Sequence, residues 1–205
     1  MKQNAKILFL GAHPDDVELN CLGSILKWQD EYSIVPYLLV CTRGLAFSRK
    51  EEQNLSSGFY GVKDIVWGEF EDGNFVHNLR LVSFIEENII KINPDFVFTH
   101  VESDYHQDHI AVSKSTVSAL RHRNINLIFY PSITNSLFPV SQFNENLYVD
   151  ITNYFQSKIK ILSGFKSQRD KYYFSKEFLG AQMKRINQQK ETRYYETFKI
   201  GRVFN

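Results

Sequence analysis

Short apolar segments alternate with helix-like segments along the first two thirds of the chain, and this alternation constrains the fold more than any other feature. The apolar segments have the length of strands and lie at 5–12, 33–42, 63–68, 95–100 and 125–130. The segments between them carry helical spacing or helix-ending signals, at 23–32, 48–61, 78–93 and 109–123. Strands that are apolar throughout and are joined by helices are typical of a parallel sheet with helices on both faces. We therefore predict an α/β fold built on a mainly parallel sheet.

The pattern weakens after Pro131. The remaining segments with a clear pattern are a strand at 147–152 and helices at 153–168 and 177–193. No internal repeat, low-complexity segment or linker separates one part of the chain from another. We predict a single domain over residues 1–205, with a core at about 1–131 and a C-terminal elaboration at about 132–205.

Charge and composition argue against several classes of protein. The 24 basic and 23 acidic residues give a net charge of +1, so electrostatics do not favour binding to nucleic acid or to an anionic membrane. The apolar stretch at the N-terminus is too short for a signal peptide, and no segment has the roughly 18 apolar residues that span a membrane. Cys21 and Cys41 are too few for a disulfide scaffold and are interpreted as buried thiols of a reducing compartment. We expect a soluble cytoplasmic protein.

Two predicted strand ends are rich in side chains that bind metals or transfer protons. In open α/β sheets, ligands bind beyond the carboxyl ends of the strands. The first strand is followed by His13, Asp15 and Asp16, the second by Arg43, and the fourth by His100, Asp104, His106, Asp108 and His109. The first strand end lacks the G-x-G-x-x-G pattern of a dinucleotide-binding loop, so we expect no nicotinamide or flavin cofactor.

The spacing of these residues predicts a metal site. Pro14 fixes its own φ and restricts His13 to extended geometry, which holds a turn where His13 and Asp16 can converge on one point. His106 and His109 have the same spacing at the start of a predicted helix, where side chains three apart share a face. Imidazole nitrogen and carboxylate oxygen are ligands of zinc and ferrous iron, and a catalytic zinc typically has three protein ligands. His13, Asp16 and one of the two later histidines would complete such a set.

Of the two later histidines, we favour His109 as the ligand and His106 as a catalytic group beside the metal. Asp108 is then expected to orient the His106 imidazole, as carboxylates commonly do. Asp15 is expected to act as general base on a metal-bound water, whose pKa the metal lowers to about 7. Alone, the first motif could be a helix cap and the second a surface pair, but their joint occurrence favours a metal site. The other histidines, His77, His100 and His122, are interpreted as structural.

Two motifs resemble the PIG-L/LmbE-like zinc N-deacetylases. "AHPDDVELNCLGSI" at the end of the first strand is the more specific, and "HQDH" after the fourth strand supports it. Weaker likenesses are "TRG", "SRKEEQNLSSGFYGV", "VDIT", "KSQ" and "YYETF". The resemblance spans nearly the whole chain and is strong over 5–113. It implies a Rossmann-like sheet with a variable C-terminal portion and the removal of an N-acetyl group from an amino sugar.

The resemblance also implies roles for individual residues. His13, Asp16 and His109 correspond to the zinc ligands of the family, and Asp15 corresponds to its general base. His106 corresponds to the residue that stabilises the oxyanion and can protonate the leaving amine.

Residues near the expected substrate match the family less closely. Arg49 and Glu52 correspond to the R-x-x-E pattern that the resemblance places near the sugar. Asn20 and Leu22 stand where the family usually has glycines, so a bulkier pair is expected to reshape the pocket. Arg43 is unusual between a threonine and a glycine. It would either contact a phosphate or carboxylate of the substrate or pair with an acidic residue of the chain.

We therefore predict a zinc-dependent N-deacetylase, with Fe²⁺ as the alternative metal, that acts on an N-acetylamino sugar or its conjugate. Two alternatives remain at this point, an amidase that removes a larger acyl group and a sugar-binding relative without activity. The expected partner is the small-molecule substrate, and the sequence leaves a homo-oligomer open.

Overall fold

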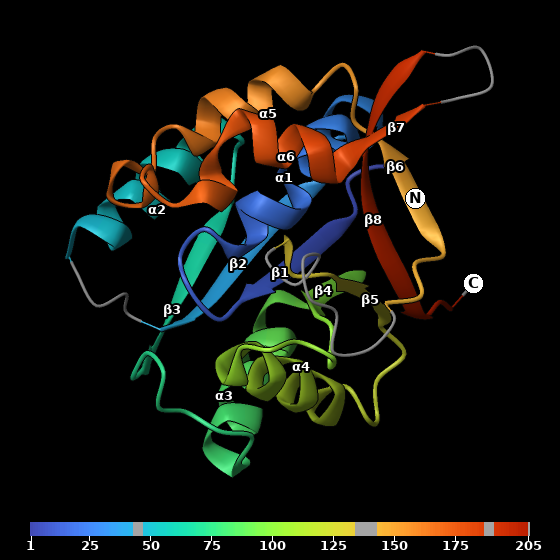
Figure 1. Cartoon of the computed structure of the whole chain (residues 1–205). Coiled ribbons are helices and arrows are strands. Elements are labelled where there is room, and N and C mark those ends of the chain that lie inside the picture. The colour runs from blue at the N-terminus through green and yellow to red at the C-terminus, as the bar shows by residue number, and fades with distance from the viewer. Residues whose placement is uncertain (43–46, 134–142, 187–190, 205) are drawn as a thin grey trace.

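The computed structural model describes residues 1–42, 47–133, 143–186 and 191–204, which form a mixed eight-stranded sheet covered by helices (Figure 1). The strands are β1 (Lys6–Gly11), β2 (Val35–Thr42), β3 (Asp64–Phe70), β4 (Phe96–His100), β5 (Asn126–Tyr130), β6 (Leu147–Asp150), β7 (Lys184–Ile186) and β8 (Thr192–Arg202). The α-helices are α1 (Asp16–Tyr32), α2 (Phe47–Phe59), α3 (Leu79–Ile92), α4 (Gln107–Ala119), α5 (Phe155–Leu162) and α6 (Lys176–Met183). Two 3₁₀ helices, η2 (Lys166–Gln168) and η3 (Tyr172–Phe174), connect α5 to α6.

The order of the strands places the ends of β1 and β4 at a topological switch point. The sheet runs β3-β2-β1-β4-β5-β8-β6, and the first five strands in this order pair in parallel. The chain passes from β1 outward to β2 and β3, and then returns to β4 on the other side of β1. Ligands of such sheets bind beyond the strand ends where the order reverses. The segments that follow β1 and β4 are the two that carry the predicted site.

The two faces of the sheet are covered by different helices. Along β1, Ile7 and Phe9 pack into a cluster with α1, α5 and α6, whereas Leu8 and Leu10 pack into a second cluster with α3 and α4. Figure 1 shows these helical layers above and below the sheet. Side chains that alternate between two buried faces explain why the strands are apolar throughout. The predicted α/β fold with helices on both faces is confirmed. No helix within the described ranges is long and apolar enough to cross a membrane.

Helix α1 begins at Asp16, seven positions before the predicted start at 23. Gly23, where the predicted helix begins, lies inside α1, and a Cβ atom there would come within 2.6 Å of the Ile151 side chain. The glycine therefore allows a close approach between α1 and the segment after β6. As a result, the predicted metal ligand Asp16 lies in the first turn of a helix, where a carboxylate is stabilised by the helix dipole.

The C-terminal part departs most from the prediction. The helix predicted at 177–193 ends at Met183, and the chain continues as β7 and then as the long strand β8. The helix predicted at 153–168 is divided into α5 and η2. β8 runs antiparallel between β5 and β6, so it extends the sheet beyond its parallel part.

A buried ion pair joins this C-terminal part to α1. Lys158 on α5 and Glu196 on β8 are 0% and 2% exposed, and Lys158 Nζ lies 2.6 Å from Glu196 Oε1. The two Glu196 oxygens accept hydrogen bonds from the backbone N–H groups of Gly23 and Ser24, at 2.9 and 2.7 Å. Lys158 Nζ also donates to the carbonyl oxygen of Leu19 at 2.7 Å. In an uninterrupted α-helix the N–H of residue 23 pairs with the carbonyl of residue 19. In this turn of α1 both groups form hydrogen bonds with the ion pair, which lies outside the helix.

Candidate metal centre and active site

A polar cavity of about 220 Å³ lies where the segments after β1 and β4 meet. It is lined by His13, Asp15, Asp16, Leu19, Asn20, Arg49, Asp72, His106, His109, Ser132, Ile133, Lys171 and Tyr173. The cavity is therefore lined by all three predicted metal ligands, by the predicted base Asp15 and by His106, the first histidine of the HxxH pair. The carboxyl ends of β1, β3 and β4 contribute most of its charged side chains, as expected of a parallel sheet.

The turn between β1 and α1 is fixed by its own hydrogen bonds. The His13 backbone N–H donates to Asp16 Oδ2 at 2.8 Å, which holds the Asp16 carboxylate against the turn. Asp15 adopts a left-handed conformation with φ 88°, which is uncommon for a residue other than glycine. This conformation places the two neighbouring aspartates in different surroundings, and retained strain of this kind is concentrated at functional sites.

His109 is held by a carboxylate on one ring nitrogen and faces a second carboxylate with the other. Its Nδ1 lies 2.8 Å from Asp104 Oδ2, and its Nε2 lies 3.5 Å from Asp16 Oδ1. The other Asp104 oxygen accepts the backbone N–H of His106 at 2.9 Å. Histidines that bind metals usually donate their second N–H to a carboxylate or carbonyl, which fixes the tautomer.

His13 has the same arrangement. Its Nε2 lies 3.1 Å from both Asp108 Oδ2 and Asp72 Oδ1, while its Nδ1 faces Asp16 Oδ2 at 3.6 Å. Each of the two histidines thus has its far nitrogen held by a carboxylate and its near nitrogen directed toward Asp16. This donor set, two imidazoles and one carboxylate with outer carboxylates behind them, fits a zinc or ferrous ion.

The charge of the site also fits a metal cation. Burial opposes protonation of His13, but its hydrogen bonds to Asp108, Asp16 and Asp72 prevail and raise its pKa to about 12. Burial likewise opposes protonation of His109, but Asp16 and Asp104 raise its pKa to about 9. A cluster of carboxylates that keeps two buried imidazoles protonated has an excess of negative charge. A divalent cation would offset that excess.

Three other groupings of potential ligands occur in the described part of the chain, and one of them joins His13 to Asp72 and Asp108, the carboxylates that hold its far nitrogen. Ligand atoms of Asp16, His100 and His109 lie within 4.8 Å of one another, but His100 Nε2 accepts the backbone N–H of Ala12 at 3.1 Å and has no free lone pair. Burial lowers the pKa of His100 to about 4, so the ring is neutral. Ligand atoms of His13, His106 and His109 also lie within 4.8 Å of one another. His106, however, lacks a carboxylate on its far nitrogen, whereas His109 has Asp104 there. The geometry therefore favours His109 over His106 as a ligand.

Asp15 lies beside the metal ligands without being directed at them. Its Oδ2 accepts a hydrogen bond from Arg49 at 2.9 Å, and its backbone N–H donates to Gln53 Oε1 at 2.9 Å. Gln53 in turn donates to the buried carboxylate of Glu18, so a chain of hydrogen bonds supports the strained turn. Burial raises the pKa of Asp15 to about 7, although the Arg49 guanidinium opposes the shift. A carboxylate with this pKa can accept a proton near neutral pH.

His106 is at the exposed side of the cavity, and its partner differs from the one we predicted. Its Nδ1 accepts the backbone N–H of Asp108 at 3.3 Å, and burial together with His109 and His13 lowers its pKa. The neutral ring therefore carries its proton on Nε2. The expectation that the Asp108 side chain orients His106 is wrong, because that carboxylate contacts His13 and accepts the backbone N–H of Gly73 at 2.7 Å. Asp108 lies between His106 and His109 in the sequence, but the fold directs its side chain toward His13 in the turn after β1.

The residues expected near the substrate have different positions. Arg49 lines the cavity, where it donates to Asp15 and to the Pro14 carbonyl. Glu52 is not among the described residues that line the cavity, and its two oxygens accept hydrogen bonds from Ser167 at 2.9 and 2.6 Å. Its predicted role at the sugar is therefore replaced by a contact between α2 and η2. Arg43 lies outside the described residues.

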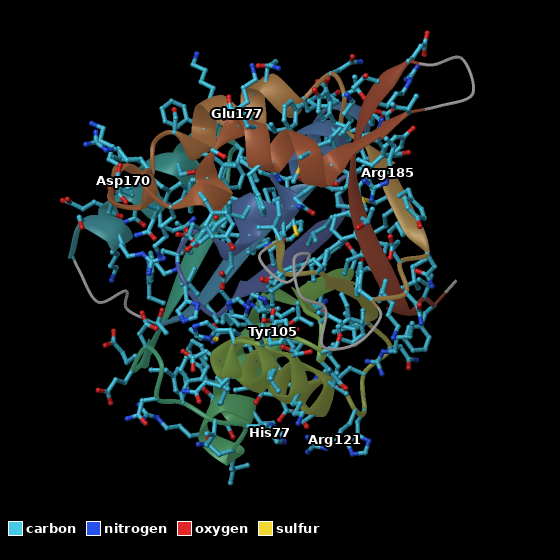
Figure 2. All side chains as sticks on the ribbon, in the orientation of Figure 1. His77, Tyr105, Arg121, Asp170, Glu177 and Arg185 are labelled. Carbon is cyan, nitrogen blue, oxygen red and sulfur yellow. The ribbon has the colours of Figure 1, made fainter. Side chains whose placement is uncertain are left out.

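The two residues that replace glycines also differ from each other. Asn20 lines the cavity, as the sequence suggested, whereas Leu22 is on α1 and is buried in the hydrophobic core. Among the histidines interpreted as structural, His77 lies near α3 (Figure 2), with its Nδ1 2.9 Å from Ser115 Oγ, and it does not line the cavity.

Three residues that hold the proposed ligands or the base in place have no predicted role. Asp72 follows the end of β3, which is a third carboxyl end at the same edge, so the position of that strand could have indicated it. Asp104 was recognised as part of the cluster after β4, but its contact with His109 depends on the path of the loop. Gln53 gives no signal in the sequence, because only the packing of α2 against α1 brings it to Asp15.

Comparisons with known proteins concern the family and the fold of the chain. The chain is 30% identical over 125 residues to the uncharacterized deacetylase YaiS of Escherichia coli, covering 56% of this chain and 68% of that protein. The conserved protein TT1542 from Thermus thermophilus has the same fold, with a TM-score of 0.81, 22% identity and coverage of 98% and 96% of the two chains. The N,N'-diacetylchitobiose deacetylase from Pyrococcus horikoshii gives a TM-score of 0.75 with 20% identity, over 96% of this chain and 83% of that one.

Residues 8–120 match the family described as PIG-L, GlcNAc-PI de-N-acetylase. The matched segment runs from β1 to the end of α4 and includes every residue of the proposed metal centre. Because this segment makes up more than half of the sequence, the chain belongs to the PIG-L family.

Proposed function

We propose that this protein is a metal-dependent hydrolase that removes the N-acetyl group from an N-acetylamino sugar or its conjugate. The observation that carries the proposal is the arrangement around Asp16. The near nitrogens of His13 and His109 face this carboxylate, the far nitrogens are held by other carboxylates, and Asp15 lies alongside. His13, Asp16 and His109 would hold zinc, with Fe²⁺ as the alternative.

A metal bound by these residues would supply a Lewis acid that lowers the pKa of water and polarises the amide carbonyl. Asp15 then takes the proton from the attacking water, for which a pKa of about 7 is well suited. Arg49 holds the Asp15 carboxylate in place through its hydrogen bond, so the base keeps one orientation. Once protonated, Asp15 can deliver the proton to the departing amine, a role that the family resemblance gives to His106.

His106 stabilises the negative charge that develops on the carbonyl oxygen. Because its Nδ1 accepts a backbone N–H, its Nε2–H is the donor that remains for the cavity. A neutral donor directed at a developing oxyanion is typically worth about 100- to 1,000-fold in turnover.

The fold and the family support an N-deacetylase, and the names of relatives point in the same direction. YaiS is called a deacetylase, and the Pyrococcus protein is a deacetylase of N,N'-diacetylchitobiose. Both an amidase with a larger acyl group and a sugar-binding protein without activity stay as alternatives. The presence of a buried base beside the ligand set favours the enzyme.

The test is the release of free amine from a panel of N-acetylated amino sugars and their conjugates, with metal-free protein, added Zn²⁺ or added Fe²⁺. We expect metal-dependent amine release from at least one member, and loss of that release in Asp15→Asn although the metal stays bound. Glu52→Gln is a matched control, since this carboxylate lies outside the cavity and contacts Ser167. Full activity in Asp15→Asn, or equal activity with and without metal, would contradict the proposed mechanism.

A further inference from the structure

A second cavity adjoins the polar one on the side of β8. It has a volume of about 200 Å³ and shares Asn20, Ser132 and Ile133 with the metal cavity. Its other lining residues are Val101, Ser103, Pro131, Phe143, Glu145, Gln182, Met183, Arg185, Tyr195, Glu196 and Thr197. Aliphatic and aromatic side chains thus form much of its wall, in contrast to the charged wall of the metal cavity.

Asn20, together with Ser132 and Ile133, forms the wall that the two cavities share. Its Nδ2 donates to the carbonyl oxygen of Asp16 at 2.7 Å, and its Oδ1 accepts the backbone N–H of Ile133 at 3.0 Å. The side chain thus connects the first turn of α1, which carries a metal ligand, to the segment after β5. A molecule held at Asp16 would need to extend only past Asn20 to enter the second cavity.

Two of the three charged residues that line the second cavity, Glu196 and Arg185, are held by other groups, and the third is Glu145. Glu196 is saturated by Lys158 and by the N–H groups of Gly23 and Ser24. Arg185 is exposed on β7 (Figure 2), and its guanidinium donates to the carbonyl oxygens of Gln182 and Lys184. The remaining lining is mainly apolar and open to water, and such surfaces next to polar sites commonly bind the apolar part of a ligand.

We propose that this cavity binds an apolar substituent of the substrate while the amino sugar lies at the metal centre. The proposal rests on the proposed function, because the metal cavity defines where the sugar is held. The substituent is an alkyl or aryl group, carried by the sugar either on its anomeric oxygen or as part of its N-acyl group. In both cases an apolar group extends past Asn20 and is transferred from water into the second cavity.

Two series of compounds distinguish these sources. In the first, the N-acetyl group is kept and the alkyl group of a β-glycoside of N-acetylglucosamine is lengthened from methyl to hexyl. In the second, the sugar is kept free and the N-acyl group is lengthened from acetyl to hexanoyl. Each methylene transferred from water to an apolar cavity is worth about fourfold in affinity or kcat/KM. We expect a rise of this size per methylene in one of the two series, until the cavity is filled.

Variants that fill the cavity provide the decisive measurement. Gln182→Trp on α6 and Thr197→Trp on β8 place an indole in the cavity from two different walls, and neither residue touches the metal centre. Ala181→Trp is the matched control, because Ala181 is the exposed neighbour of Gln182 on the same helix and does not line the cavity. We expect the two filling variants to lose the gain with chain length, by at least tenfold for the longest compound. Activity on N-acetylglucosamine should stay unchanged in all three.

Affinity measured by calorimetry makes the test independent of turnover. If no compound releases amine, the proposed function fails, but a chain-length gain in affinity that both filling variants abolish would still support the cavity as a binding site. If affinity and kcat/KM are flat in both series, or rise equally in native and filled proteins, the inference is refuted. Since filling from either wall gives the same expectation, poor folding of one variant leaves the other to decide.

Discussion

Replacing Asp104 by Asn tests whether a carboxylate behind His109 prepares this histidine as a metal ligand. Asp104 is buried, with its Oδ2 2.8 Å from His109 Nδ1 and its Oδ1 2.9 Å from the backbone N of His106. Asparagine has nearly the same shape, and its amide oxygen can still accept the His106 N–H. The amide NH₂ would then face His109 Nδ1 and act as a donor.

The change should alter the tautomer of His109 and weaken metal binding. With a donor at Nδ1, the neutral ring carries its proton on Nε2, which is the nitrogen that faces Asp16. A hydrogen bond to a charged group is worth about 1.5–3 kcal/mol, which corresponds to about 10- to 150-fold in an equilibrium constant. Loss of such a partner behind a metal ligand typically costs 10- to 100-fold in metal affinity. We therefore expect Asp104→Asn to bind Zn²⁺ about 10- to 100-fold more weakly than the native protein.

The assay is competition for Zn²⁺ against a chelator of known affinity, followed by turnover at saturating metal. Glu102→Gln is the matched control, because Glu102 is an exposed carboxylate on the same loop. The control should bind metal as the native protein does. If Asp104→Asn also binds within twofold of the native protein while remaining folded, the carboxylate does not prepare His109 and our account of the ligand set is wrong.

Three further predictions concern other contacts of the structure. Arg49→Met should move the acidic limb of the kcat/KM profile to higher pH, because Arg49 is a cation that lowers the pKa of Asp15 and burial raises this pKa further without it. Arg49→Lys should move the limb less, and a limb that moves to lower pH would contradict the assignment of Asp15 as the base. Zn²⁺ binding to metal-free protein at pH 7 should release protons and become stronger as pH rises, because the pKa values of His13 and His109 lie at about 12 and 9. Calorimetric titration in buffers of different ionisation enthalpy measures the number of protons released. Binding without proton release would exclude these histidines as ligands. Lys158→Met should lower the free energy of unfolding by about 3–5 kcal/mol in denaturant titrations, because it leaves the buried carboxylate of Glu196 without its cation. A loss below about 1 kcal/mol would show that the ion pair is not needed for stability.

The parts of the site that the sequence predicted are those set by local spacing. His13 and Asp16 are brought together by a four-residue turn whose proline restricts the backbone, and the structure shows a hydrogen bond within that turn. The parallel sheet could also be predicted, since strands buried on both faces are apolar throughout. These two expectations together located the cavity at the ends of β1 and β4.

The partners within the site could not be predicted, because they depend on the paths of loops. Asp108 is only two positions from His106 in the sequence, yet its side chain contacts His13. Glu52 fits the spacing expected of a substrate residue, but the position of η2 makes Ser167 its partner. In both cases the sequence shows which groups are present near the site, and only the fold shows which of them meet.

β8 was missed for a different reason, because a charged residue occupies a core position. In the run Thr192–Arg202, Glu196 and Phe198 are both buried, so the strand has the expected period of two. A glutamate at one of these positions makes the run read as polar. Its buried partner Lys158, on α5, equally reads as a surface residue of an amphipathic helix.

The ion pair between α5 and β8 also bears on the order in which the site can form. Gly23 and Glu196 are separated by 173 positions, so α1 acquires these bonds only after nearly all the described chain is available. Contacts between such distant segments slow folding, because the intervening chain must first lose its conformational freedom. The turn that carries His13 and Asp16 is synthesised well before β8, but its helix is held by that strand. A nascent chain therefore has the metal ligands well before it has the framework that holds them in place, which delays the assembly of a competent site until β8 has entered the sheet.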